Sequence, residues 1–182
     1  MRVIAGIYKS RSLKAVKSNT TRPTTDRNKE NLFNMIGPYF DGGVVLDLFG
    51  GSGGLGIEAM SRGCQQLISV DHNFQAYQTI KENISNLKME NVQVWKADYK
   101  KALQKCLSMN LKFDYVFLDP PYGQGFCDEI LPFLVENKLL NENAIVVVEE
   151  NKSMQLPHLD QLSCRKVVNY GITTLHILDF EV

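Results

Sequence analysis

The chain has 182 residues, of which 44% are hydrophobic and 22% are charged, and its 20 lysines and arginines balance 20 acids. These values are typical of a globular domain with a sizeable core, and they exclude disordered and fibrous proteins. No apolar run approaches the ~18 residues needed to cross a bilayer, and the N-terminal segment becomes basic before a signal-peptide core can form. We therefore expect a cytoplasmic protein that makes no membrane contact.

The distributions of cysteines and charges narrow the partners to expect. The four cysteines form no Cys-x-x-Cys pair, which favours reduced thiols over a metal site or a disulfide framework. Residues 1–30 contain eight lysines and arginines but only two acids, so the rest of the chain is net acidic. This asymmetry suggests that a polyanion meets the N-terminal end. A solvated basic hairpin is an equally open alternative.

The first 42 residues are expected to form a small basic extension. Residues 2–13 alternate irregularly around a glycine, which predicts a short β-hairpin, and a polar loop follows. Apolar residues at helical spacing then predict a helix over residues 29–36, with Thr25 or Asp26 as its N-cap. That helix is expected to stop at Gly37-Pro38.

Strand and helix patterns alternate over residues 43–182, the expected catalytic core of a single domain. Alternating β and α units predict an α/β, Rossmann-like sheet that is mostly parallel, with right-handed crossovers and helices on both faces. A turn signal between the last two strands predicts an antiparallel C-terminal hairpin. The strands are expected over residues 44–49, 66–71, 91–95, 114–119, 144–149, 166–168 and 173–180. One helix is expected to follow the glycine-rich residues 50–56 and to end at about residue 62, and the other helices are expected over residues 74–87, 100–108 and 128–136.

A glycine-rich loop follows the first strand of this core. Residues 51–56 fit the pattern Gly-x-Gly-x-x-Gly, and Asp71 ends the next strand 20 residues after Gly51. Glycines in this place let a ligand approach the backbone closely, and the distant acid can accept from ribose hydroxyls. The combination predicts a nucleotide or nucleoside site, with a purely structural glycine turn as the alternative.

The acids near this loop favour a cationic ligand. Asp47 lies within the first strand, three residues before Gly50, and a carboxylate there would repel the phosphates of a dinucleotide. S-adenosylmethionine, which carries a sulfonium and an ammonium, fits better. Asp98 follows the third strand at the same edge of the sheet, where it could accept from the adenine amino group or cap the next helix.

The fourth strand is expected to end abruptly at Asp119-Pro120-Pro121-Tyr122. Proline has no backbone donor and forces the preceding residue to be extended, so neither helix nor sheet continues through the pair. The result is a rigid shelf with one acid, free backbone carbonyls and an aromatic ring at the edge where open α/β sheets bind ligands. A strand that merely ends in a proline turn would explain the prolines but not the acid and the tyrosine.

Two sets of residues resemble a known family. The run Asp47-Leu48-Phe49-x-Gly51-Ser52-Gly53-x-Leu55-Gly56, together with the Asp-Pro-Pro-Tyr shelf, resembles the class I S-adenosylmethionine-dependent methyltransferases that modify exocyclic amines. The run Arg22-Pro23-Thr24-x-Asp26-Arg27-x-Lys29-Glu30-x-Leu32-Phe33-Asn34 resembles the signature of the RsmD-type bacterial 16S ribosomal RNA guanine-N2 methyltransferases. The resemblance covers nearly the whole chain.

The resemblance implies a role for each motif. Asp119 and the Pro120 carbonyl would each accept one hydrogen of the guanine N2 amine and turn its lone pair toward the methyl group, and Tyr122 would stack on the flipped base. S-adenosylmethionine would be held by Asp47, Phe49, Gly51, Ser52, Gly53, Gly56, Asp71 and Asp98. RNA would be held by Arg11, Arg22, Thr24, Arg27 and Lys29.

The implied partner is 16S ribosomal RNA or a 30S assembly intermediate, and the expected state is a monomer without a metal ion. A DNA adenine-N6 or cytosine-N4 methylase uses a similar shelf but usually needs a further target-recognition domain, for which this chain is short. A non-catalytic RNA-binding assembly factor is the other alternative, and the intact glycine loop and Asp119 argue against it.

Overall fold

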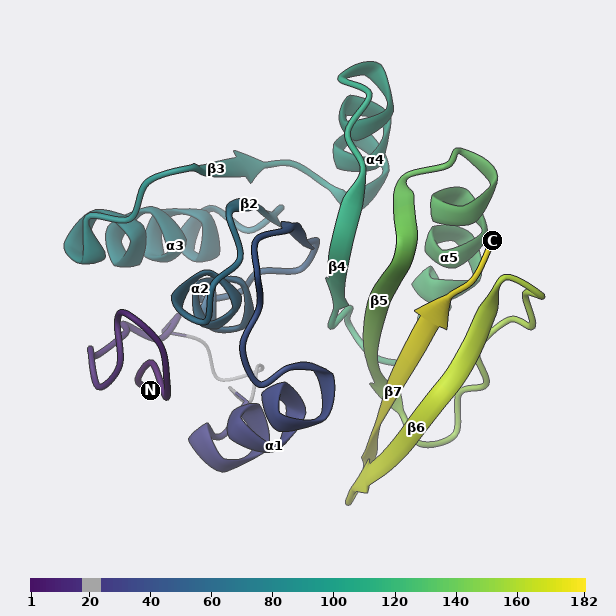
Figure 1. Cartoon of the computed structure of the whole chain (residues 1–182), viewed down its shortest axis with the longest axis horizontal. Helices are drawn as coiled ribbons and strands as arrows, with labels where there is room; N and C mark the ends of the chain where they lie inside the picture. The colour runs from purple at the N-terminus through teal and green to yellow at the C-terminus, as the bar shows by residue number, and fades with distance from the viewer. Residues whose placement is uncertain (18–23) are drawn as a thin grey trace.

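The computed structural model describes residues 1–17 and 24–182. Within these described residues, seven strands form one sheet in the order β3-β2-β1-β4-β5-β7-β6 (Figure 1). Among the described residues, no helix has both the length and the apolar character needed to span a bilayer. The strands are β1 (Val44–Asp47), β2 (Gln66–Asp71), β3 (Val92–Lys96), β4 (Phe113–Leu118), β5 (Leu140–Asn151), β6 (Leu162–Tyr170) and β7 (Thr173–Phe180). The helices are α1 (Asp26–Ile36), α2 (Gly54–Ser61), α3 (Phe74–Leu87), α4 (Tyr99–Ser108) and α5 (Phe126–Glu136).

The strand directions confirm the expected Rossmann-like sheet. Strands β1 to β5 pair in parallel, whereas β7 runs antiparallel to both β5 and β6. The chain moves outward from β1 through β2 to β3 and then returns to place β4 on the other side of β1. In such sheets the ligand crevice lies where the strand order reverses, at the carboxyl ends of the strands. The ligand site is therefore expected at that edge of the sheet.

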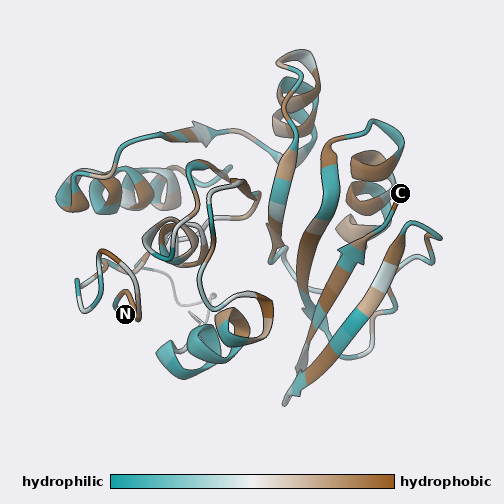
Figure 2. Ribbon diagram, viewed as in Figure 1, coloured by the Kyte–Doolittle hydropathy of each residue, from teal (hydrophilic) through white to brown (hydrophobic). Residues whose placement is uncertain are grey.

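The central strands separate two hydrophobic cores because successive side chains point to opposite faces. On β4, Val116 and Leu118 face the core covered by α4 and α5, whereas Phe117 faces the core covered by α1 and α2. Val148 and Val147 of β5 repeat this pattern. Figure 2 shows hydrophobic residues along β4, β5 and β7 and hydrophilic residues in the N-terminal turns of α1.

The bounds of most elements lie close to those expected, and β2, α3 and β7 coincide with them. Two strands are longer. β5 was expected over residues 144–149 but covers 140–151, because β4 pairs with one of its edges and β7 with the other. β6 was expected over residues 166–168 but covers 162–170. As an edge strand with mostly exposed side chains, it carries no clear apolar alternation.

The N-terminal extension differs from the expected β-hairpin. It contains one isolated antiparallel bridge, between Arg2 and Ser12, and no regular strand within its described residues. Backbone hydrogen bonds nevertheless hold its two arms together, including one of 2.9 Å from the Val3 amide to the Arg11 carbonyl. Val3 and Leu13 are buried in the core beneath α1 and α2. The described part of the extension is thus packed against the sheet domain.

Candidate active site

The strand ends bring together acids that are far apart in the sequence. Asp47 is the last residue of β1, Asp71 is the last residue of β2, and Asp119 directly follows β4. In register, Asp47 lies beside Phe117 of β4 and Ser69 of β2. Because these strands are parallel, all three carboxylates lie at the same edge of the sheet, next to the loop between β1 and α2.

Two of these acids shape the glycine loop. The Gly51 amide donates to Asp71 Oδ2 over 2.9 Å, and the Gly56 amide donates to Asp47 Oδ2 over 3.2 Å. A Cβ at Gly56 would lie 2.7 Å from Leu67 Cδ1, so this glycine permits α2 to pack against β2. A Cβ at Gly51 would meet no atom within 4 Å, and its φ is +60°. Gly51 therefore leaves open backbone to a ligand.

The other expected loop residues serve the start of α2. Gly53 is the N-cap of α2 with a φ of +86°, a left-handed conformation that glycine adopts without strain. The Ser52 carbonyl accepts from the Asn83 amide of α3 over 2.9 Å. Asp71 accepts a second backbone hydrogen bond, from Asn73. Because a carboxylate offers about four lone-pair sites, it keeps acceptor capacity for ribose hydroxyls.

The burial of Asp47 disfavours the ionised form of its carboxylate. Its side chain is buried, and burial raises its pKa to about 7, a rise that Asp71 adds to and that the Gly56 hydrogen bond opposes. Desolvation disfavours the charged form of a carboxylate, and a nearby cation restores it. A ligand that places a positive charge here would therefore be stabilised.

An aromatic cluster lies beside the loop. Phe49 and Phe126 stack with ring centroids 6.2 Å apart and planes at 3°, and Tyr99 packs against Phe126 at 4.8 Å. Asp98, just before Tyr99, caps α4 by accepting from the Lys101 amide over 3.0 Å. The expected residues Phe49 and Asp98 are thus neighbours of Tyr99 and Phe126, which the sequence patterns had not singled out.

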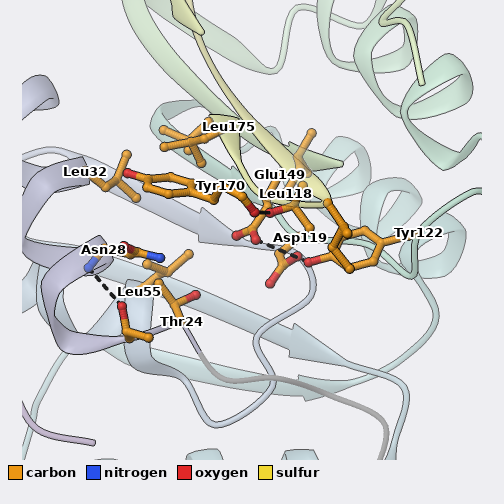
Figure 3. Close-up of a pocket in the computed structure, with 14 residues that line it drawn as sticks. Thr24, Asn28, Leu32, Leu55, Leu118, Asp119, Tyr122, Glu149, Tyr170 and Leu175 are labelled. Atoms are coloured by element: carbon orange, nitrogen blue, oxygen red, sulfur yellow. Dashed lines mark hydrogen bonds between the residues drawn. The ribbon is translucent and has the colours of Figure 1, made fainter. Parts of the chain in front are cut away.

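Asp119 lines a pocket of about 340 Å³, which lies between the N-terminal turns of α1 and the hairpin that joins β6 and β7 (Figure 3). Leu55, Leu118 and Leu175 give it apolar walls. Polar groups line it from four segments. These are Thr24, Thr25 and Asn28 at the start of α1, Asp119 and Tyr122 after β4, Glu149 near the end of β5, and Tyr170 and Thr173 in the hairpin that joins β6 and β7.

The carboxylate of Asp119 lies in an acidic environment. Burial raises its pKa well above the usual value, and Glu149, Asp47 and Glu150 raise it further, in that order. The half-exposed Tyr122 donates from its hydroxyl to Glu149 Oε1 over 3.2 Å. Asp119 is thus a carboxylate of increased basicity at the junction of the pocket and the glycine loop.

Pro120 directly follows Asp119 in the chain and is buried. Glu150 holds the loop after the two prolines. Its Oε1 accepts from the Gly123 and Asn151 amides over 3.2 and 2.9 Å, and its buried Oε2 has no hydrogen-bond partner. Sequence reasoning missed both Glu149 and Glu150. The available signal was a buried strand that ends in two adjacent acids, the same signal that identified Asp47 and Asp71.

The expected RNA-binding residues that the structure describes do not form one group. Thr24 lines the pocket, and Arg27 is exposed on the first turn of α1. Arg11 is exposed but lies elsewhere, since its guanidinium donates to the Asn86 carbonyl near the C-terminal end of α3. Arg22 lies outside the described residues.

Lys29 requires a correction, because its buried position does not allow the RNA contact that the resemblance implies. Its side chain is 1% exposed, its Nζ donates to the Arg2 carbonyl over 2.6 Å, and it lies 3.5 Å from the fully buried Glu58. Glu58 also accepts from Arg62 Nε over 2.9 Å. A buried cation is stable only when it is paired and hydrogen-bonded, so Lys29 is part of an interior ion-pair network.

Comparisons with known proteins agree with this architecture. A protein of Bacillus subtilis named "Putative rRNA methyltransferase YlbH" is 46% identical over 179 residues, which cover 97% of each chain. The "Ribosomal RNA small subunit methyltransferase D" of Haemophilus influenzae is 33% identical over 182 residues, covering 97% of this chain and 92% of that protein. A solved structure, "Putative methyltransferase yhhF from Escherichia coli", superposes with a TM-score of 0.86 at 28% identity and covers 100% of this chain and 98% of that chain.

These similarities confirm the family inferred from the two sets of motifs. The match to a family model extends over residues 1–179, so it includes the basic extension, the glycine loop, the Asp-Pro-Pro-Tyr shelf and the C-terminal hairpin. The fold is that of the Rossmann-like S-adenosylmethionine-dependent methyltransferases. The chain belongs to the family described as Conserved hypothetical protein 95.

Proposed function

We propose that the protein is an S-adenosylmethionine-dependent methyltransferase that modifies the exocyclic N2 amine of a guanine in 16S ribosomal RNA. The observation that carries this proposal is the position of Asp119, which directly follows β4 beside the glycine loop and lines the pocket next to α1. A methyl donor and an acceptor amine can meet at this carboxylate. The relatives named as ribosomal RNA methyltransferases support the substrate class.

The residues at the ends of β1 and β2 fit S-adenosylmethionine. Asp47 and Asp119 are carboxylates whose pKa values lie above the usual range, so cationic groups between them are favoured. Gly51 offers open backbone, Asp71 offers acceptors for ribose hydroxyls, and Phe49 offers an apolar face for adenine. When bound, S-adenosylmethionine supplies an electrophilic methyl group.

The residues of the shelf act on the acceptor amine. The lone pair of the guanine N2 amine is conjugated with the ring, so the amine is a poor nucleophile. Asp119 and the Pro120 carbonyl each accept one amine hydrogen, which turns the lone pair out of conjugation and stabilises the positive charge that develops on nitrogen. The raised pKa of Asp119 also makes its carboxylate a competent acceptor for the proton that leaves. Tyr122, at the pocket mouth, stacks on the extruded base.

The basic extension, residues 1–42, supplies the RNA contacts, and residues 43–182 supply the catalytic core. Thr24 at the pocket and Arg27 on the exposed face of α1 are the described residues suited to hold the target strand. The protein acts as a monomer in the cytoplasm, on 16S ribosomal RNA or on a 30S assembly intermediate.

The decisive experiment is methyl transfer from labelled S-adenosylmethionine to naked 16S ribosomal RNA, to partially assembled 30S particles and to DNA. Nucleoside analysis of the product is expected to yield N2-methylguanosine from an RNA arm. Methylated adenine or cytosine from the DNA arm would refute the RNA assignment. If no arm accepts a methyl group while S-adenosylmethionine binds, the proposed enzymatic activity is wrong.

Variants of Asp119 test the mechanism. Asp119→Ala is expected to lower kcat by at least about 100-fold, the scale of removing one preorganised transition-state group. Affinity for S-adenosylmethionine, measured by calorimetry, should change by only a few fold. Asp119→Asn should retain more activity than the alanine variant because the amide oxygen still accepts one hydrogen. Equal activities of the two variants would contradict the hydrogen-bonding role.

A further inference from the structure

Glu149 occupies a position that the proposed reaction leaves without a role. Its Cα lies on β5 one residue beyond Val148, and Val148 is paired in register with Leu118, the last residue of β4. Since paired strands are only about 4.8 Å apart, Asp119 and Glu149 are neighbours across the strand ends. Figure 3 shows both carboxylates in the same part of the pocket.

The alternation along β5 directs the Glu149 side chain into the pocket. Val147, two residues earlier on the same face, lines the pocket, as does Leu175, the partner of Glu149 on β7. Glu150 points to the other face, where it holds the loop after the prolines. The Glu149 carboxylate thus lies in the pocket wall beside Val147 and Leu175, next to the group proposed to bind the acceptor amine.

Within the part of the chain that the structure describes, Glu149 has one polar side-chain partner, the Tyr122 hydroxyl on Oε1. It forms no ion pair with a described residue. A carboxylate can accept about four hydrogen bonds, so Glu149 retains acceptor capacity toward the pocket. A hydrogen-bond donor on the ligand is therefore the complementary group.

We propose that Glu149 selects guanine by accepting a hydrogen bond from its N1–H. This inference rests on the proposed function. On the Watson–Crick edge of guanine, the N1–H donor lies directly beside the N2 amine. When Asp119 and Pro120 hold the amine, the neighbouring carboxylate of Glu149 is placed to accept from N1.

The same carboxylate rejects the other bases that carry an exocyclic amine. Beside its amine, adenine presents N1 and cytosine presents N3, and both are bare acceptors that face an anion unfavourably. The Asp-Pro-Pro-Tyr shelf by itself binds any such amine. Glu149 therefore supplies the discrimination that the shelf lacks, since a site built to bond a donor strongly rejects an analogue without it.

The test compares guanine with 2-aminopurine, which keeps the N2 amine but has an unprotonated N1. A synthetic segment places either base at the methylated position of 16S ribosomal RNA, which is offered in the form that the wild-type protein methylates. Glu149→Ala is expected to lower kcat/KM for guanine by about 10–100-fold, the loss of a hydrogen bond to a charged group. It should not lower kcat/KM for 2-aminopurine, so the preference for guanine should fall at least about 10-fold.

Two further variants separate base selection from a structural role. Glu149→Gln keeps an acceptor for guanine and gains a donor for N1 of 2-aminopurine, so it should retain most guanine activity while relaxing the preference. Tyr122→Phe removes the hydroxyl that Glu149 binds but leaves the carboxylate, so its ratio of guanine to 2-aminopurine should match the wild type. Calorimetry with S-adenosylmethionine verifies that each variant is folded.

The outcomes are distinct. If the ratio in Glu149→Ala equals that of the wild type, or if Tyr122→Phe reduces it equally, Glu149 does not read N1–H and the inference is overturned. If the wild-type protein transfers no methyl group to guanine at all, the proposed function itself has failed.

Discussion

Replacement of Asp47 by asparagine is expected to stabilise the ligand-free protein increasingly as the pH rises and to weaken its binding of S-adenosylmethionine. Asp47 is 2% exposed, and burial raises its pKa from 3.8 to about 7. The unfolded chain releases the Asp47 proton near pH 3.8, whereas the folded protein retains it until about pH 7. Between these values the folded state binds more protons, so the stability of the wild-type protein falls as the pH rises.

The magnitude follows from the size of the shift. Each pKa unit corresponds to about 1.4 kcal/mol, so the rise of about three units costs the folded protein about 4 kcal/mol once the pH exceeds 7. About 3 kcal/mol of this cost accumulates between pH 5 and pH 8. Asparagine does not titrate, and its amide oxygen can still accept from Gly56. Any cost of burying the amide is independent of pH, so the change with pH isolates the charge.

The assay is urea unfolding of both proteins at pH 5 and pH 8 in the absence of ligand. The difference in the free energy of unfolding, variant minus wild type, should increase by about 3 kcal/mol between the two values. Calorimetry at pH 8 should show that the variant binds S-adenosylmethionine at least about 10-fold more weakly, because an interaction with a charged group is lost. A difference in unfolding free energy that stays constant with pH would refute the burial argument.

Two matched pairs test other parts of the structure. Lys29→Ala removes one of the two cations that neutralise the buried Glu58 carboxylate and should cost about 3–5 kcal/mol of stability. Arg27→Ala, on the exposed face of α1, should cost less than about 0.5 kcal/mol. Equal costs in urea unfolding would contradict the buried position of Lys29. Gly51→Ala and Gly171→Ala both place a side chain at a positive φ with no atom within 4 Å, so each should lose about 1–2 kcal/mol. Only Gly51→Ala should weaken S-adenosylmethionine binding in calorimetry. Equal affinities of the two variants would remove Gly51 from the proposed cofactor site.

The sequence predicted the sheet and the meeting of the acids at one of its edges because the signals for both are local. Apolar runs, turn glycines and an acid at each strand end lie within a few residues of one another, and β2 and α3 occupy the expected positions. Asp47, Asp71 and Asp119 meet at one edge because parallel strands align their carboxyl ends.

Residues whose roles depend on distant partners were not predictable in this way. Lys29 is indistinguishable in sequence from an exposed helical lysine, and its burial depends on Glu58, which lies on another helix. Glu149 faces the pocket only because β5 pairs with β4 and β7 in a particular register. The edge strand β6 lacks a buried face along much of its length, so its extent is set by pairing with β7 alone.

The Glu58 network has a consequence for exchanging parts between relatives. Glu58 accepts from the Ile4 and Ala5 amides at 3.0–3.2 Å and also binds Lys29 and Arg62. One carboxylate on α2 therefore binds both the N-terminal segment and α1, while α2 begins at the glycine loop and α1 borders the proposed acceptor pocket. The pocket wall proposed to meet RNA and the helix that begins at the glycine loop share a single anchor. A chimaera that takes its first 42 residues from another protein therefore needs a lysine at the position of Lys29. Without it, Glu58 no longer holds α1 and α2 in fixed relative positions.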